Sequence, residues 1–282
     1  MSRPRRSRTA AFVWHAAVIA LLIVVLYPIA WVVAATFKPS TDIVGSLDLL
    51  PARPTTANYS RAAEGVAGVS ILRFFLNSTV LAVLAVVGNL ASCTLTAYAF
   101  ARLRFRGRGL LFVVMISTLL LPFHVLVVPQ YVVFNRLGLI DTYVPLLIGK
   151  FLAAEAFFVF LIMQFIRTLP HELDESAKID GAGHWRIFWN IILPLTRPAL
   201  ITTALFTFIW TWNDFFGPLI YLSTPEKYPL PVALQLYIDE TTGSDFGALM
   251  SMSVLALVPV VLFFLFFQRF LVEGVSTTGL KG

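Results

Sequence analysis

The chemically distinctive residues of this chain lie between Pro170 and Pro198, in a polar stretch with apolar sequence on both sides. Three carboxylates, Glu172, Asp174 and Glu175, are followed by small side chains and two glycines. Carboxylates in a first turn complement the helix dipole. Small residues beside charged ones suit close approach of another protein, so we predict that this stretch is presented to a partner.

No pattern in the sequence predicts catalysis or metal binding. The only cysteine, Cys93, lies in an apolar run and cannot form an internal disulfide. The histidines have no ligand spacing with Cys93 or with one another; they are His15, His124, His171 and His184. We therefore predict no catalytic residue and no metal site.

Three polar residues inside apolar segments are candidates for a translocation pathway: His124, Asn213 and Asp214. Ionisable groups within a membrane usually face the bundle interior or a water-filled cavity. The alternative for His124 is a hydrogen-bonded packing role, and the alternative for Asp214 is one buried acid beside an aromatic anchor. Lys150 and Glu155 lie where their side chains reach the interface, so we expect them to be mainly structural.

The composition places these residues in a membrane. Of 282 residues, 58% are hydrophobic and 13% are charged, against about 25% charged residues in a soluble domain. The net charge of +6 is unevenly distributed along the chain. A nucleic-acid partner is therefore a poor explanation for the basic residues, and membrane lipid is the expected surrounding.

Apolar runs predict an all-α protein with six transmembrane helices, since a crossing needs roughly 20 apolar residues. The expected spans are residues 11–37, 74–101, 109–135, 145–166, 199–222 and 246–268. The first is longer than the apolar region of a cleaved signal peptide, so we predict that it is retained. Pro122 and Pro129 are expected to bend the third.

The distribution of Lys and Arg predicts the orientation. With the N-terminus inside, the inner segments carry about twice as many of these residues as the outer ones. Both termini and the polar stretch are therefore expected in the cytoplasm. The predicted organisation is a basic N-terminus at 1–10, a first helix at 11–37, an extracytoplasmic loop at 38–72, a core at 73–270 with a cytoplasmic loop at 168–198, and a cytoplasmic tail at 271–282.

The cytoplasmic loop is expected to contain two short helices. The first covers about 170–180 and is broken by Gly181 and Gly183. The second presents Trp185, Phe188, Trp189 and Ile192 on one face, is ended by Pro194, and gives way to the fifth span at Pro198. An interfacial hairpin lying on lipid headgroups is the alternative to a protein-binding surface.

The spacing Glu175-Ser176-Ala177, Gly181, Ile191 and Leu193-Pro194 resembles the EAA motif of binding-protein-dependent ABC importer permeases, with Ser176 where the family usually has alanine. The resemblance covers almost the whole chain and is closest to the carbohydrate branch, the maltose-type second permease subunit with a MetI-like transmembrane domain. It also rests on Asn77-Ser78, Ala97-Tyr98-Ala99 with Arg102, Trp212-Asn213, and Gly279-Leu280-Lys281-Gly282. The type I ABC importer fold is therefore expected.

The resemblance implies that the motif is a coupling helix seated on a cytoplasmic ATPase. Glu175 would pair with an ATPase arginine, and Ala177 and Gly181 would allow close packing. The other coupling positions that it implies are Ser176, Asp180, Leu193 and Pro194. It also implies that the long outer loop at 223–245 contacts a solute-binding protein.

The chain has no GxxxxGK[ST] phosphate-binding loop, so we expect no cofactor here and ATP with Mg²⁺ on a separate ATPase. The resemblance implies a second homologous permease, a pair of ABC ATPases and a solute-binding protein as partners. The predicted function is a multi-pass, non-catalytic permease subunit of a sugar importer in the prokaryotic cytoplasmic membrane. The alternatives are import of another organic solute, such as glycerol 3-phosphate, or an ion-coupled secondary transporter.

Overall fold

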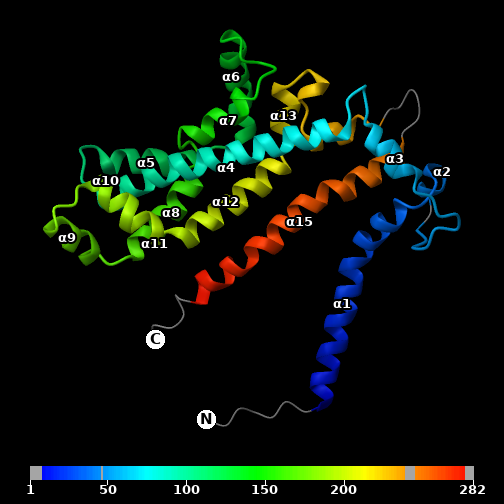
Figure 1. Cartoon of the computed structure of the whole chain (residues 1–282), viewed down its shortest axis with the longest axis horizontal. Coiled ribbons are helices and arrows are strands. Elements are labelled where there is room, and N and C mark those ends of the chain that lie inside the picture. Colours follow the sequence, from blue (N-terminus) through cyan, green and yellow to red (C-terminus); the bar gives the residue numbers. More distant parts are fainter. Residues whose placement is uncertain (1–7, 46, 239–244, 277–282) are drawn as a thin grey trace. The chain divides into compact units, whose positions relative to one another are not determined.

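The computed structural model describes residues 8–45, 47–238 and 245–276, and every regular element within these ranges is a helix (Figure 1). The all-α prediction is confirmed. The basic N-terminus up to residue 7 and the tail motif Gly279–Gly282 lie outside the described residues. Residues 1–71 with 234–257 form one compact unit, and residues 72–233 with 258–282 form a second.

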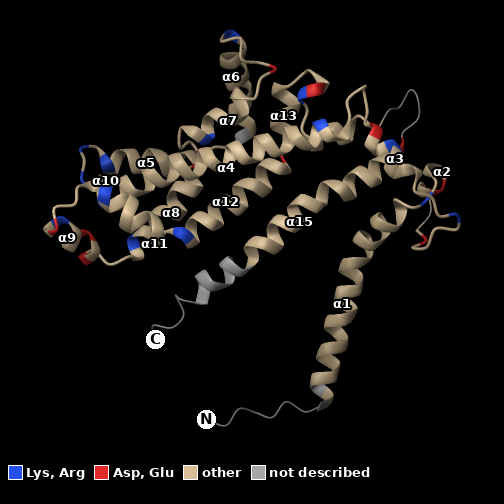
Figure 2. Cartoon of the chain, viewed as in Figure 1, with Lys and Arg blue, Asp and Glu red and all other residues tan. Residues whose placement is uncertain are grey.

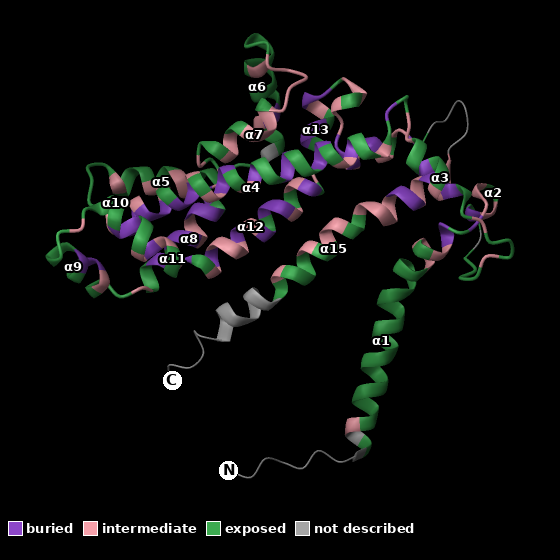
Figure 3. Cartoon of the chain, viewed as in Figure 1, coloured by how far each residue is buried: buried purple, intermediate pink, exposed green. Residues whose placement is uncertain are grey.

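The elements of the first unit begin with a long apolar helix. They are α1 (Arg8–Ala35), α2 (Ser40–Ile43), α3 (Ala57–Glu64) and the first half of α15 (Phe246–Ser276). The side chains of α1 are exposed along nearly its whole length (Figure 3). Such an apolar helix is covered by lipid or by other protein in a membrane.

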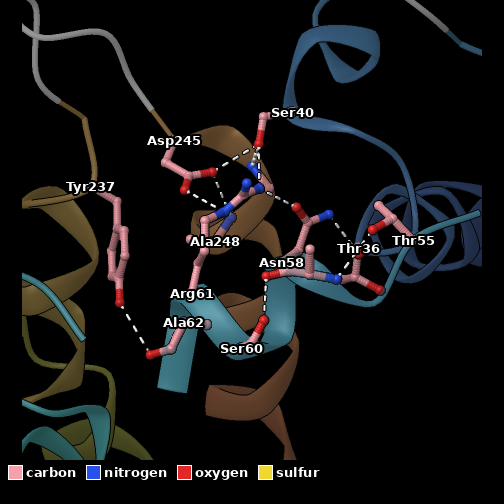
Figure 4. Close-up of polar contacts among 12 residues, drawn as sticks. Thr36, Ser40, Thr55, Asn58, Ser60, Arg61, Ala62, Tyr237, Asp245 and Ala248 are labelled. Atoms are coloured by element: carbon pink, nitrogen blue, oxygen red, sulfur yellow. Dashed lines mark hydrogen bonds and ion pairs between the residues drawn. The ribbon is translucent and has the colours of Figure 1, made fainter. Parts of the chain in front are cut away.

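A polar cluster ties α3 to the segments on either side of it in the first unit (Figure 4). The Asn58 amide donates to the backbone oxygens of Thr36 and Lys38, both at 2.7 Å. Arg61 forms an ion pair with Asp245 at 2.8 Å, and Asp245 accepts a hydrogen bond from the Ala248 N–H in the first turn of α15. These contacts hold α3 against the segment that follows α1 and against the start of α15.

Tyr237 also contacts α3, because its hydroxyl donates to the backbone oxygen of Ala62 at 3.3 Å. Burial, reinforced by the negative charge of Asp245, raises the pKa of Tyr237 to about 12. The hydroxyl therefore keeps its proton, and with it the hydrogen bond, across the physiological pH range.

The second unit contains the remaining helices. They are α4 (Ile71–Arg102), α5 (Arg108–Thr118), α6 (Phe123–Arg136), α7 (Val144–Phe151), α8 (Ala156–Thr168), α9 (Glu172–Ile179), α10 (His184–Ile187), η1 (Phe188–Ile192), α11 (Leu193–Leu195), α12 (Arg197–Trp212), α13 (Phe216–Tyr221), η2 (Pro225–Lys227), α14 (Leu230–Gln235) and the second half of α15. Its core lies between α4, α8 and α10–η1 (Figure 3).

Close helix contacts hold this unit together. Gly88 of α4 faces the Phe151 ring of α7, and a Cβ there would lie 2.9 Å from the ring, so a larger residue would displace the ring. The rings of Phe208 in α12 and Phe263 in α15 stack with centroids 4.1 Å apart. Stacked rings and small residues at helix crossings are typical of packing within membranes.

Several predicted spans are broken rather than straight. Four described helical segments are long and apolar enough to cross a membrane: Ala11–Ala35, Ile71–Arg102, Val144–Thr168 and Phe246–Gln268. The bent pair His184–Leu195 with Arg197–Trp212 makes a fifth if its two parts are counted as one span. The expected third span is divided into α5, which ends at Thr118, and α6, which begins at Phe123 directly after Pro122. The count of six spans and the cytoplasmic termini stay predictions.

Candidate functional site

The insert, which we define as residues 170–198, folds as two short helical segments. In Figure 2 charged residues gather around α9 and α10, whereas the long helices of this unit carry few. Helix α9 begins at Glu172, and Glu172, Asp174 and Glu175 occupy its first turn. Gly181 follows with φ +79°, a left-handed conformation that glycine adopts without strain. The predicted first helix and its glycine stop agree with the structure.

A buried ion pair attaches α9 to the end of α4. The Arg102 Nε lies 3.1 Å from Asp174 Oδ2, and the two side chains are only 2% and 8% exposed. The same guanidinium donates to the Leu169 backbone oxygen at 2.7 Å and lies 2.9 Å from the His171 ring nitrogens. Three groups at the start of the insert, or just before it, therefore meet one side chain of α4.

Tyr98 attaches the second half of the insert to the same helix. Its hydroxyl donates to the His184 backbone oxygen at 3.2 Å, and its ring lies 5.1 Å from that of Phe188. Tyr98 and Arg102 are one helical turn apart, so they lie on the same face of α4. One face of α4 thus holds both helices of the insert.

Apolar packing against α8 also holds the insert in place. Ile187, Phe188 and Ile192 are at most 2% exposed and pack with Met163 and Ile166 of α8. Burying large apolar side chains contributes roughly 1.5–3 kcal/mol each. The insert is therefore packed onto the transmembrane helices and is more than a surface loop.

Two details of the predicted second helix are wrong. Pro194 does not end it, because the helical run His184–Leu195 continues for one residue beyond the proline. The break comes at the buried Thr196, and the helical segments on either side meet at 73°. The expected aromatic face is also split, because Trp185 and Trp189 are 66% and 56% exposed while Phe188 is buried.

The predicted coupling residues divide into two groups. Glu175, Ser176, Asp180, Gly181 and Pro194 are exposed, and Leu193 is half-buried. Ala177 is buried in this chain's own core, so its small side chain serves internal packing. Within the described residues the Glu175 carboxylate has no ion pair or side-chain hydrogen bond, so it is available to a partner.

The predicted pathway residues are not gathered into one site. His124 lies in the first turn of α6 with its ring 5.1 Å from that of Phe216. The Asn213 amide donates to the Ile209 backbone oxygen at 2.8 Å, and Asp214 Oδ1 accepts from the Gly217 N–H at 3.1 Å. Only Asp214 of the three lines a large cavity, which also contains Lys150 and Glu155.

Sequence reasoning missed the contribution of Lys150 and Glu155 to that cavity. Their ion pair of 2.5 Å joins the end of α7 to the start of α8. The signal was two opposite charges five residues apart in an apolar run. The structural role expected for this pair does not include lining a cavity.

The outer segment, which we define as residues 223–230, is held by polar side chains. Asp141, with φ +60°, accepts hydrogen bonds from the backbone N–H groups of Ser223 and Thr224 and from the Thr224 hydroxyl. Its carboxylate also pairs with Lys227 at 2.7 Å. Burial alone would raise the pKa of Asp141, but the hydrogen bonds from Lys227, Thr224 and Ser223 outweigh it and hold the pKa well below its usual range.

The start of α4 holds the outer segment from the other side. The Asn77 amide donates to the backbone oxygens of Glu226 and Tyr228, at 2.8 and 2.9 Å. Ser78 Oγ accepts from the Leu230 N–H at 2.8 Å. These bonds fix the backbone and leave the Glu226 side chain exposed. Residues 239–244, also in the predicted contact loop, lie outside the described residues.

Comparisons with known proteins agree with this architecture. The family described as "Binding-protein-dependent transport system inner membrane component" matches residues 88–277. A solved structure of a bacterial ABC transporter involved in the import of alginate superposes with a TM-score of 0.82. That match covers 95% of this chain and 99% of the solved chain at 24% identity.

Three curated relatives are similar over nearly their whole length. The chain is 33% identical to the diacetylchitobiose uptake permease NgcG of Streptomyces coelicolor, covering 95% of this chain and 88% of the relative. It is 30% identical to the galactooligosaccharide permease GanQ of Bacillus subtilis, with coverages of 93% and 92%. Identity to the sn-glycerol-3-phosphate permease UgpE of Agrobacterium fabrum is 34%, with coverages of 94% and 95%.

Proposed function

This chain belongs to the family of binding-protein-dependent transport system inner membrane components, and from that premise we propose that it is the permease subunit through which an ATP-driven importer passes a sugar across the cytoplasmic membrane. The observation that carries the proposal is the insert. It is packed firmly onto α4 and α8, yet it exposes Glu175 without a partner in the described part of the chain.

An exposed carboxylate on a rigid support suits an arginine on another protein, because planar bidentate pairing needs a fixed acceptor. We infer that this arginine belongs to a cytoplasmic ATPase and that Ser176, Asp180, Gly181 and Pro194 line the contact. The half-buried Leu193 and the buried Ala177 support it from within. ATP and Mg²⁺ bind to the ATPase in this scheme, and the permease itself binds no cofactor and catalyses no reaction.

The attachment of the insert to α4 provides a mechanical step. When the ATPase pair closes on ATP, the insert moves with it. Arg102 and Tyr98 then transmit that movement to α4, because their contacts with the insert are buried or within hydrogen-bond distance. The proposed result is alternating access in the membrane, shared with a second homologous permease.

The outer segment supports a second contact, with the solute-binding protein. Its backbone is fixed by Asp141 and Asn77, while Glu226 faces outward. A fixed surface binds with less loss of conformational freedom than a mobile loop. We propose that this surface receives the loaded solute-binding protein, and that the pathway candidates His124, Asn213 and Asp214 lie inward of it.

A sugar is the proposed cargo because relatives such as NgcG and GanQ are named as oligosaccharide permeases. The alternative is glycerol 3-phosphate, which UgpE is named for. The alternative from another class of transporter is an ion-coupled secondary transporter. Such a protein binds no ATPase, so this alternative gives the exposed insert no function.

The energy source tests the proposal directly. The chain is expressed with its complete transporter in cells that lack other uptake routes, and entry of labelled oligosaccharides is followed in ATP-replete membrane vesicles prepared from these cells. Vanadate should stop uptake, whereas a protonophore applied to ATP-replete vesicles should leave it largely intact. Uptake that survives vanadate and collapses with the protonophore would identify a secondary transporter.

A further inference from the structure

A cavity of about 520 Å³ lies within the second unit, among α5, α6, α7, α8 and α13. Its size falls within the range of roughly 300–1,000 Å³ that is usual for small-molecule sites. Charged and polar side chains line it beside aromatic ones, and each of the three charged residues lies at or beside a break between two helices. Ionisable groups held within a membrane protein commonly mark solute pathways.

The charged side chains of the cavity are held in fixed positions. Lys150 and Glu155 form their 2.5 Å ion pair across the break between α7 and α8 and are 18% and 29% exposed. Asp214 occupies the break between α12 and α13 and accepts from the Gly217 N–H. A Cβ at Gly217 would lie 2.6 Å from Asp214 Oδ2, so the carboxylate fits closely against this glycine.

The balance of charge in the cavity is negative. Lys150 is already paired with Glu155, and the Asp214 carboxylate has no ion pair within the described residues. An anionic solute such as a phosphate ester would meet a net negative charge, because two acids and one base line the cavity, and like charges brought together are unfavourable. A neutral solute with hydroxyl groups would instead donate hydrogen bonds to Asp214.

The uncharged part of the lining matches the same kind of solute. Phe134, Phe157 and Tyr221 supply aromatic surface, and the Tyr221 hydroxyl donates to Gln130 Oε1 at 3.3 Å. An amide and a phenol both donate and accept hydrogen bonds. Aromatic faces beside such groups suit a ring that is apolar on its faces and polar at its edge.

We propose that this cavity binds a neutral polyhydroxylated ring, a single sugar unit, and disfavours phosphate esters. The inference rests on the proposed function and sharpens it, because overall similarity to the sugar and glycerol-3-phosphate permeases is nearly equal. It also assigns solute contact to this subunit's own helices.

The charge of the cavity is testable without knowledge of the cargo. The only native cysteine, Cys93, is fully buried and is replaced by alanine. Ala154, which is exposed and lines the cavity, is replaced by cysteine. In the full chain within its transporter, the labelling rate of the introduced thiol is measured with cationic and anionic methanethiosulfonates. Asp214→Asn should lower the cation-to-anion rate ratio at least about fivefold, whereas the control Glu64→Gln, at an exposed acid outside the cavity, should not.

Protection then tests the ligand class. A panel of neutral mono- and disaccharides in millimolar excess should include at least one member that slows the labelling about twofold or more, and glycerol 3-phosphate should not. An unchanged rate ratio in Asp214→Asn, protection by glycerol 3-phosphate, or protection by none of the sugars would each overturn the inference. Uptake by the unmodified transporter is measured in parallel: vanadate-sensitive sugar uptake without protection refutes only the cavity, whereas vanadate-insensitive uptake refutes the proposed function.

Discussion

The insert and the outer segment are held at opposite ends of the same helix, but by different interactions. At the C-terminal end of α4, Arg102 and Tyr98 hold the insert, and the ion pair to Asp174 is almost completely buried. Near the N-terminal end, Asn77 and Ser78 hold the outer segment through hydrogen bonds with its backbone. With 32 residues, α4 is about 48 Å long, more than a bilayer core needs.

The difference shows how one helix serves two partners. The buried ionic attachment resists separation, so the insert cannot move without α4. The hydrogen bonds at the other end fix the backbone of the outer segment and leave side chains such as Glu226 exposed. We infer that α4 transmits force at one end and presents a surface at the other.

Breaking the buried pair should have the largest effect on stability. Arg102→Met leaves Asp174 charged and without its cation, which should lower the free energy of unfolding by about 3–5 kcal/mol. Thermal or denaturant unfolding in detergent measures it, with Arg104→Met, an exposed arginine nearby, as the control. The double variant Arg102→Met with Asp174→Leu should recover most of the loss; no recovery would show that the charge is not the cause.

Removing the carboxylate of Asp141 should have a smaller effect. Asn tolerates the left-handed backbone at this position, so Asp141→Asn removes the charge without new strain. We expect a loss of about 1.5–3 kcal/mol near neutral pH, as for hydrogen bonds to a charged group.

The Asp141 contribution also has a defined pH dependence. Because the pKa of Asp141 is lower in the folded chain than in the unfolded one, its stabilisation is fully present above about pH 4 and is lost as the pH falls through the folded value. The stability difference between the wild type and Asp141→Asn should therefore shrink on acidification below about pH 4. A difference that grows there would contradict the assignment.

Shortening Asn77 should cost least among the three attachments. Asn77→Ala leaves the Glu226 and Tyr228 backbone oxygens without this donor, for a loss of about 1–2 kcal/mol. The exposed Thr79→Ala is the matched control, with a change within about 0.5 kcal/mol. If solute-binding-protein docking is unaffected by Asn77→Ala, the outer segment does not depend on α4 as described.

The sequence predicted the features that depend on local chemistry. Acidic residues in a first turn and Gly181 located α9 correctly, and the apolar runs located the long helices. The burial of Phe188 and Ile192, away from the exposed Trp185 and Trp189, was not predicted, because η1 is a π-helix and departs from the 3.6-residue period on which the expected single face was based. The expected stop at Pro194 lies two residues before the observed break at Thr196, because a sequence pattern does not locate a helix end to within one or two residues.

Contacts between residues far apart in the sequence could not be predicted from local sequence patterns. Arg102 and Asp174, or Asp141 and Lys227, carry no mutual signal in the sequence, and only the packing of α4, α9 and the outer segment brings them together. The same holds for Asp214, which is far in sequence from the Lys150–Glu155 pair and shares one cavity with it. Their proximity depends on tertiary structure alone.

The most direct test of the account is Glu175→Arg, with Glu172→Arg as its control. Both acids are exposed in the first turn of α9 and interact with the same helix dipole, so both changes should lower stability by a similar amount, about 0.5–2 kcal/mol. ATP-driven uptake and co-purification of the ATPase are measured for both variants. We predict that Glu175→Arg inserts normally but abolishes uptake, while Glu172→Arg retains most of it. Normal uptake and normal ATPase co-purification in Glu175→Arg would contradict the proposed coupling role of the insert.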